Sequence, residues 1–218
     1  MRVYHFINQE HGLDDLRTRR LKIATILELN DPFELFAINH SDESVRRAFR
    51  VMKEELAQSK GLLCFSRSWR NPVQWSHYAD KHRGICFGFD VPDELLGRVS
   101  YSRKRLVAET EQLVSPHQVD SETARQFLFT KYVHWRYEDE VRCFVNLEQR
   151  DPETNLYFTE FSPQLNLREV IVGACSNLTR ATVNQALGDN LDQVAVFKAR
   201  LAFKTFKVVR QKNKGLWT

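Results

Sequence analysis

The sequence predicts one mixed α+β domain that spans residues 1–218 and is built on a mostly antiparallel sheet. About eight segments have strand character, and the helices between them come at irregular intervals, without the β-α-β alternation of a doubly wound sheet. No linker rich in Gly, Ser or Pro divides the chain, which favours a single domain. Its 15 Phe, 6 Tyr and 4 Trp side chains suffice for a large core.

In the first half of the chain, periodicity and turn residues define the elements. Strands are expected at 2–7, 21–26, 61–66 and 85–91, and a turn at 30–33. Helices are expected at 13–20, at 44–59 and from Pro72 to a left-handed cap at Gly84. Asn71 is expected to cap the last of these helices, with Pro72 in its first position and Gln74 closing a capping box.

In the second half, one or two helical turns are expected at 93–97, extended chain at 99–109 and a loop at 110–119. A helix is expected to begin at Asp120 or Ser121 and to continue to Trp135, with Lys131 interrupting its apolar stripe. Strands follow at 156–161 and 169–174, a helix at 178–187, and a strand pair from Val194. A phase change near Thr205 predicts a bulge or bend.

The segment 130–145 carries the strongest indication of chemistry. If Val141, Cys143 and Val145 face the core, then Glu138, Glu140 and Arg142 share the opposite face of a strand. Three charges on one face require solvent, ion partners or a substrate. An exposed ion network and a catalytic carboxylate pair are both compatible with this pattern. Lys131 could reach the protein rim, pair with one of the carboxylates or meet a phosphate.

Three other aromatic or imidazole side chains could bind a ligand. His5 lies beside apolar Val3 and Ile7, so it is either a hydrogen-bonded core residue or a ring that donates to a ligand hydroxyl. Trp75 and Tyr78 share one side of a predicted helix, where they could enter the core or form the wall of a cleft that stacks on a flat ring.

The C-terminal region is strongly basic. Seven positive charges without an intervening acid stand at Lys198, Arg200, Lys204, Lys207, Arg210, Lys212 and Lys214. The segment 198–214 could attract the phosphates of a nucleic acid, or its lysines could protect the edge of a sheet.

Several classes of protein are disfavoured. The chain lacks a P-loop and the GxGxxG, HExxH and GxSxG motifs, and its His residues lack metal-ligand spacing. The four Cys residues form no CxxC pair, so a bound metal is not expected. We expect instead that all four thiols are buried and reduced. Without an apolar leader or an apolar run of ~18 residues, we expect a cytoplasmic protein that does not enter a membrane.

Six blocks resemble a bacterial family of uncharacterised domains. They are residues 3–6 (VYHF), 30–34 (NDPFE), 64–66 (CFS), 75–79 (WSHYA), 84–90 (GICFGFD) and 135–142 (WRYEDEVR). More distantly, a His on the first strand, a Tyr on a helix after a strand that ends in Ser66, and a later Glu-x-Glu resemble the His-Tyr-Glu class of ADP-ribosyltransferases.

This second resemblance implies a split antiparallel β core that grips NAD. His5 would bond the ribose next to nicotinamide, Tyr78 or less readily Trp75 would stack on nicotinamide, and Glu140 would be the catalytic carboxylate, assisted by Glu138. Tyr4, Ser66, Lys131 and Arg142 are further candidates for contacts with the nucleotide.

The function expected from this resemblance is cleavage of the nicotinamide glycosidic bond of NAD and transfer of ADP-ribose to protein or nucleic acid. The alternative is a non-catalytic nucleotide- or nucleic-acid-binding module of a bacterial defence or toxin system. A third hypothesis is a metal-dependent nuclease that uses Glu138, Glu140 and Asp31.

Overall fold

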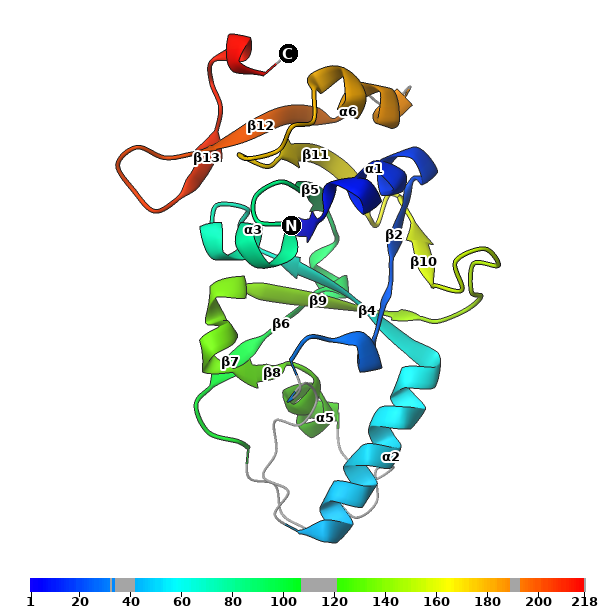
Figure 1. Ribbon diagram of the computed structural model, residues 1–218. Helices are drawn as coiled ribbons and strands as arrows, with labels where there is room; N and C mark the ends of the chain where they lie inside the picture. Colours follow the sequence, from blue (N-terminus) through cyan, green and yellow to red (C-terminus); the bar gives the residue numbers. More distant parts are fainter. Residues whose placement is uncertain (32, 34–41, 107–120, 189–192, 218) are drawn as a thin grey trace.

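A nine-stranded sheet forms the centre of the computed structural model, which describes residues 1–31, 33, 42–106, 121–188 and 193–217 (Figure 1). Its strands are β1 (Arg2–Ile7), β3 (Ala24–Thr25), β4 (Lys60–Ser66), β5 (Ile85–Asp90), β6 (Gly97–Arg98), β9 (Glu140–Asn146), β11 (Asn166–Val172), β12 (Ala195–Leu201) and β13 (Val208–Arg210). The order is β13-β12-β11-β5-β1-β4-β9-β6, with β3 also paired to β4. Only β11 and β12 pair in parallel among these described strands, so the predicted α+β class with a mostly antiparallel sheet is confirmed.

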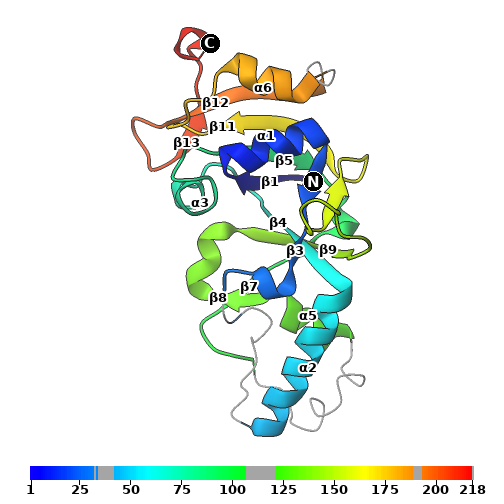
Figure 2. The same ribbon diagram turned by 45° about the vertical axis from the view of Figure 1, so that its right-hand side comes forward.

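Smaller elements surround this sheet. Two-stranded sheets join β2 (Arg20–Lys22) to β10 (Phe158–Glu160) and β7 (Ser100–Ser102) to β8 (Thr130–Tyr132). The helices are α1 (Gln9–Thr18), α2 (Glu43–Ser59), α3 (Pro72–Tyr78), α5 (Ser121–Leu128) and α6 (Arg180–Leu187). Short 3-10 turns are η1 (Ile26–Glu28), η2 (Asp93–Leu95), η4 (Val133–Glu138) and η6 (Lys214–Leu216). Helices α1 and α6 lie together at one end of the molecule, and α2 projects at the other (Figure 2).

The sheet opens between its two central strands. Strand β1 pairs with β5 along its whole length, and β4 does the same with β9. Between β1 and β4, however, the register holds a single pair, Tyr4 opposite Ser66. Beyond this point a side chain bridges the two strands, because the His5 Nδ1 atom lies 3.1 Å from the Cys64 carbonyl oxygen. The separation leaves space for a cavity in the middle of the sheet.

Most predicted helix starts are confirmed, because each has a local polar cap. The Asn71 side chain accepts from the Val73 N–H at the start of α3, and Thr179 caps α6 in the same way. Helix α1, by contrast, begins at Gln9 and not at residue 13, because the Asn8 side chain caps it.

The end of α3 was predicted wrongly. The helix stops at Tyr78, and the chain then turns through left-handed conformations at Asp80, Lys81 and His82 instead of at Gly84. Gln74 does not close a capping box, since its amide donates to groups on β4 and η4. The Gln74 side chain therefore bonds residues of other elements instead of the backbone at the start of its own helix.

The helix predicted to continue to Trp135 ends at Leu128. Residues Thr130–Tyr132 form β8, which pairs with β7, so a neighbouring strand overrides the helical periodicity of the sequence. Asp120, one of the two expected starts of this helix, and the whole predicted loop 110–119 lie outside the described residues.

The last strand pair is confirmed, with a different geometry at its end. Phe197 and Ala199 are buried on β12, whereas Leu201 at its end and Phe203 beyond it are exposed. The phase change near Thr205 is a bend, one of the two expected outcomes, and it lies in the connection that joins β12 to β13.

The cysteines differ in environment. Cys86 and Cys143 are buried, Cys64 is half-buried and Cys175 is exposed, so the prediction of four buried thiols is wrong for Cys64 and Cys175. Among the residues that the structure describes, no helix combines the length and apolar character needed to cross a membrane.

Candidate functional site

A cavity of about 180 Å³ lies where β1 and β4 separate. Its polar wall comes from segments far apart in the sequence and contains His5, Ser66, Tyr78, Lys131, Glu138 and Glu140. Tyr4, Asn30 and Gln74 also line it, together with apolar side chains. The structure therefore brings together most of the residues singled out in the sequence.

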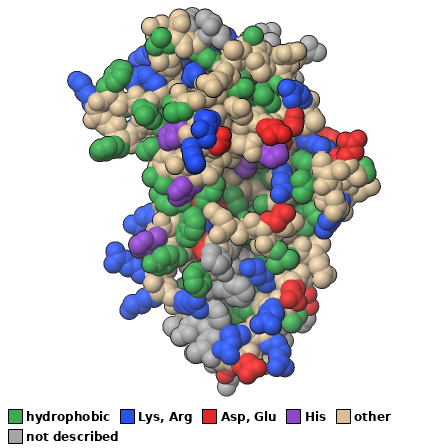
Figure 3. Space-filling view, viewed as in Figure 1, with side chains coloured by type: hydrophobic (Ala, Val, Ile, Leu, Met, Phe, Trp, Pro, Cys, Tyr) green, Lys and Arg blue, Asp and Glu red, His purple; other side chains and the backbone are tan. Residues whose placement is uncertain are grey.

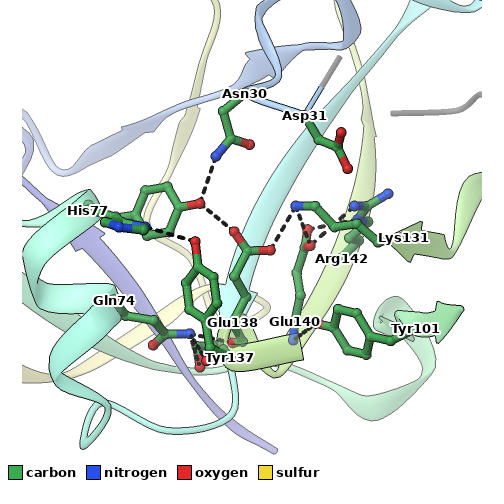
Figure 4. A network of polar contacts seen from close by, with 12 residues as sticks. Asn30, Asp31, Gln74, His77, Tyr101, Lys131, Tyr137, Glu138, Glu140 and Arg142 are labelled. Atoms are coloured by element: carbon green, nitrogen blue, oxygen red, sulfur yellow. Dashed lines mark hydrogen bonds and ion pairs between the residues drawn. The ribbon is translucent and has the colours of Figure 1, made fainter. Parts of the chain in front are cut away.

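Two carboxylates and two cations form a buried cluster beside this cavity (Figure 4). Lys131 Nζ lies 2.7 Å from Glu138 Oε2 and 3.2 Å from Glu140 Oε2, so one ammonium joins both carboxylates. Arg142 holds Glu140 through two donors, with Nε 2.7 Å from Oε1 and Nη2 3.1 Å from Oε2. The four side chains are at most 8% exposed, which shows that the charged face of this segment is not solvated.

The two carboxylates have different acidities. Burial opposes ionisation of Glu140, but the charges and hydrogen bonds of Arg142 and Lys131 outweigh it and lower the pKa to about 2. Burial is also the largest influence on Glu138, and Lys131 and Tyr78 offset only part of it, so the pKa of Glu138 is raised. Glu140 is thus a fixed anion, and Glu138 is the carboxylate better suited to exchange a proton.

Tyr78 connects the cluster to the far wall of the cavity. Its hydroxyl donates to Glu138 Oε1 and accepts from the Asn30 side-chain amide at 2.7 Å. Burial, followed by the neighbouring Glu138 charge, raises the pKa of Tyr78 strongly. The phenol therefore stays protonated and acts as a hydrogen-bond donor to the carboxylate.

The turn before β9 aims both carboxylates at the same place. Asp139 adopts a left-handed conformation, with φ of 47°, between Glu138 at the end of η4 and Glu140 at the start of β9. The side-chain amide of Gln74 donates to the Glu138 carbonyl and to Ser66 Oγ, the latter at 3.0 Å. The side-chain amide of Asn71 donates to the Tyr137 carbonyl at 2.8 Å. Helix α3 thus fixes both Tyr78 and the backbone that carries Glu138.

His5 lines the cavity, and a contact with the backbone fixes the tautomer of its ring. A carbonyl oxygen can only accept, so the contact with Cys64 places a proton on Nδ1. Burial lowers the pKa of His5, and the carbonyl contact offsets only part of this effect. In the neutral ring Nε2 is then an acceptor, which differs from the expected donor role of this side chain.

Some candidates do not line the cavity. Trp75 is fully buried, and its Nε1 donates to the Trp69 carbonyl at 2.6 Å, so it is a core residue. Arg142 lies behind Glu140, where Nη1 donates to the Leu128 carbonyl at 2.8 Å. The expected contacts of these two residues with a ligand are therefore corrected to a packing role and a supporting role. Lys131 does not reach the rim, because both carboxylates bind it.

Sequence reasoning missed the supporting residues Asn30, Gln74, Tyr101 and Tyr137. Tyr101 accepts the Glu140 N–H at 2.9 Å, and the Tyr137 hydroxyl bonds His77 Nδ1 at 2.8 Å. Asn30 and Tyr137 belong to the conspicuous blocks 30–34 and 135–142, which were the available signal. For Tyr101 the sequence holds no comparable signal.

Asp31 is a third buried carboxylate near the cluster. It is 2% exposed, and Oδ1 accepts from the Phe33 N–H, whereas Oδ2 has no hydrogen-bond partner among the described residues. Figure 4 shows its carboxylate turned toward Lys131 and Arg142. However, no three His, Cys, Asp or Glu side chains of the described chain are arranged to hold a metal ion.

A second, basic cavity adjoins the first. It measures about 390 Å³, and Lys131 belongs to the walls of both cavities. Arg103, Lys104 and Arg105 line it, together with Phe33 and Tyr132. The acidic cluster is thus flanked by a space suited to an anionic group.

The fold and this site define a mixed α+β protein whose sheet opens around a buried acid–base cluster. A family described as "Protein of unknown function (DUF2971)" matches residues 74–143, which include Tyr78, Lys131, Glu138 and Glu140. This match supports the predicted resemblance to a family of uncharacterised domains. Searches of curated proteins and of solved structures returned no match.

Proposed function

We propose that the protein is an ADP-ribosyltransferase-like enzyme that cleaves the nicotinamide glycosidic bond of NAD and transfers ADP-ribose to a protein or nucleic acid. The observation that carries this proposal is the single cavity, in the opening of an antiparallel sheet, that is lined by His5, Tyr78, Glu138 and Glu140. These are the positions that the resemblance to His-Tyr-Glu transferases assigns to the reaction.

The dimensions of the site suit one end of the dinucleotide. A volume of about 180 Å³ is below the ~300–1,000 Å³ of pockets that enclose a drug-sized ligand. It accommodates the nicotinamide end, and the adjoining cavity of about 390 Å³ offers Arg103, Lys104 and Arg105 to the diphosphate. Lys131 lies in both walls and would be close to the junction of the two parts.

The cluster supplies the electrostatics that bond cleavage needs. When the bond between ribose C1′ and the nicotinamide nitrogen breaks, the bonding pair leaves with nicotinamide and positive charge develops on the ribose. Glu140 is a fixed anion that stabilises this charge. An acceptor hydroxyl or amine then bonds to C1′, and its proton passes to Glu138.

The remaining residues orient the substrate. The Tyr78 ring forms a wall on which nicotinamide stacks, while its hydroxyl remains tied to Glu138 and Asn30. His5 Nε2 accepts from a ribose hydroxyl, in keeping with the neutral ring. Ser66 and Tyr4, at the point where β1 and β4 still meet, complete the floor.

The first test measures release of nicotinamide from labelled NAD by the purified full chain. We expect Glu140→Gln and Glu138→Gln each to lower turnover by about 100-fold or more, the scale of losses for positioned acid–base groups. Glu94→Gln, which removes an exposed carboxylate on η2, is the matched control and should leave turnover unchanged. Full turnover by Glu140→Gln would remove this residue from the mechanism.

A dependence on pH accompanies this test. Glu138 must be ionised to accept a proton, and its pKa is raised. Turnover should therefore increase as the pH rises through that pKa, and the dependence should disappear from the residual activity of Glu138→Gln. An identical pH profile in both proteins would contradict the assigned role.

A second function is favoured by one observation. Both carboxylates are already bound, Glu140 by Arg142 and Lys131 and Glu138 by Lys131 and Tyr78, as in a purely structural network. A non-catalytic nucleotide-binding module has the same cavity and binds NAD without consuming it. That alternative would be established if the protein binds NAD saturably without releasing nicotinamide, and if Glu140→Gln binds NAD with the same affinity.

A further inference from the structure

The hairpin connection between β12 and β13 exposes two aromatic rings. Phe203 is 92% exposed and Phe206 is 99% exposed, and both belong to residues 202–207. The connection projects from the body of the molecule in both ribbon views (Figures 1 and 2). Figure 3 shows hydrophobic and basic side chains together over this projection. Large apolar side chains grouped at one exposed site are characteristic of a binding surface.

Protection of a sheet edge accounts for only part of this arrangement. Strand β13 is an outer strand of the sheet, so a positive side chain such as Arg210 does discourage pairing with another chain. Phe203 and Phe206, however, lie beyond the paired residues of the hairpin, and apolar rings do not protect an edge. Their exposure therefore requires a second explanation.

The positive charge around these rings indicates that the partner is negatively charged. Lys204 and Lys207 are exposed next to the two phenylalanines, and no acidic residue occurs between positions 198 and 214. Lys198 is excluded from this surface, because its Nζ donates to the Ser176 carbonyl at 2.7 Å. An aromatic hairpin tip flanked by lysines fits an anionic partner that also offers flat apolar surface.

A contact of Arg200 favours nucleic acid over a lipid surface as the partner. Its guanidinium carbon lies 4.6 Å from the centre of the Phe203 ring, so a cation covers one face of this ring. Insertion into hydrocarbon would either bury the guanidinium, which is costly for a charged group, or give up its contact with the ring. A nucleobase instead stacks on the exposed side of the ring while a phosphate meets the cation.

We propose that this hairpin is a binding site for single-stranded nucleic acid, in which bases stack on Phe203 and Phe206 and phosphates contact Lys204 and Lys207. Binding of this kind tolerates many sequences, because every base has a π face. It goes beyond the proposed function, since it requires neither NAD nor the carboxylate cluster. A strand held here would also be a nucleic-acid partner of the kind that the transferase hypothesis includes.

The test uses the full chain and fluorescein-labelled single strands of DNA and RNA, each of about 16 nucleotides and mixed sequence. Fluorescence anisotropy should show binding that weakens as salt is added. The double variant Phe203→Ala/Phe206→Ala should bind at least about tenfold more weakly at equal salt, because both stacking rings are lost. Its melting temperature should be unchanged, since neither ring contributes to the core.

Charge variants provide a matched comparison. Lys204→Gln/Lys207→Gln should reduce the slope of log K against log salt by about 1.4, or ~0.7 for each lost phosphate contact. Arg47→Gln/Arg50→Gln removes the same charge from the exposed side of α2, and should leave the slope unchanged. Equal slopes for the two double variants would overturn the assignment.

Two other results would also overturn the proposal. One is equal affinity of the wild type and the Phe203→Ala/Phe206→Ala variant for the strands, or no binding by either. The other is Phe-dependent binding to phosphatidylserine vesicles without binding to strands, which would identify a lipid surface as the partner. A folded Glu140→Gln variant should bind strands normally, so failure of NAD turnover and failure of strand binding are separate results.

Discussion

Replacement of Arg142 by Met is expected to lower the free energy of unfolding by about 3–5 kcal/mol, the usual cost of removing one partner from a buried ion pair. The Arg142 side chain is 1% exposed and supplies two of the donors to Glu140. Without it, two buried carboxylates share the single ammonium of Lys131. The Leu128 carbonyl also loses the donor that Arg142 provides.

Urea denaturation at neutral pH measures this loss. Arg47→Met on α2 removes the same charge from a side chain that is 79% exposed and 3.7 Å from Glu43, and should change stability by no more than about 0.5 kcal/mol. The double variant Arg142→Met/Glu140→Gln should regain part of the lost stability, because it no longer buries an uncompensated charge. A neutral effect of Arg142→Met alone would mean that water reaches the cluster.

The same variant has a defined dependence on pH. In the wild type the pKa of Glu140 is lowered to about 2, so this group contributes stability above its unfolded pKa of ~4.3 and loses that contribution as the pH falls toward 2. Arg142→Met removes the largest favourable charge and raises this pKa. The difference between wild type and variant should therefore be greatest at neutral pH and should shrink below about pH 4.

Local features of the sequence predicted the framework of the fold. Strand β1, helix α2, strand β4 and the start of α3 follow from alternation, an apolar stripe and the Asn71–Pro72 cap. The early start of α1 at Gln9 has a local cause, the Asn8 cap, but the other errors arose where a distant segment decides the structure. Residues 130–132 carry a helical pattern but pair with 100–102, and the Gln74 amide is used by Glu138 and Ser66 rather than by its own helix.

The residues of the candidate site were predictable from the sequence, but their burial was not. Alternation along the segment indicated that Glu138, Glu140 and Arg142 belong together, and Lys131 stood out within an apolar stripe. Whether these charges meet solvent or one another depends on strands β4 and β6, which flank β9 on both sides. The opening between β1 and β4 likewise depends on β5 and β9, with which these two strands pair along their whole length, and sequence periodicity does not encode which strands become neighbours.

Asp15 is a buried carboxylate that forms no salt bridge with any of the described residues. It lies on α1 and is 5% exposed, and its Oδ2 has no hydrogen-bond partner among the described residues. Burial, together with the nearby Asp14 charge, raises the pKa of Asp15 to about 7, and Arg20 offsets only part of this effect. The folded protein therefore binds a proton here that the unfolded chain releases near pH ~4.

A group whose pKa is higher in the folded state than in the unfolded state stabilises the fold. This stabilisation is fully present below the unfolded-state pKa and is lost as the pH rises through the folded-state pKa. Between about pH 4 and pH 7 the wild type should lose up to about 4 kcal/mol through this group, at ~1.4 kcal/mol for each pKa unit. Asp15→Asn cannot ionise, so its advantage over the wild type should grow across this interval and become constant above pH 8.

Urea midpoints between pH 5 and pH 8 measure this advantage. Glu10→Gln on the same helix is the control, because it removes an equal charge from an exposed side chain and should follow the pH profile of the wild type. Parallel profiles for Asp15→Asn and the wild type would show that Asp15 is ionised in the folded protein at all these pH values. In that case a cation or water must reach Oδ2, and α1 must open more readily than its packing against α6 indicates.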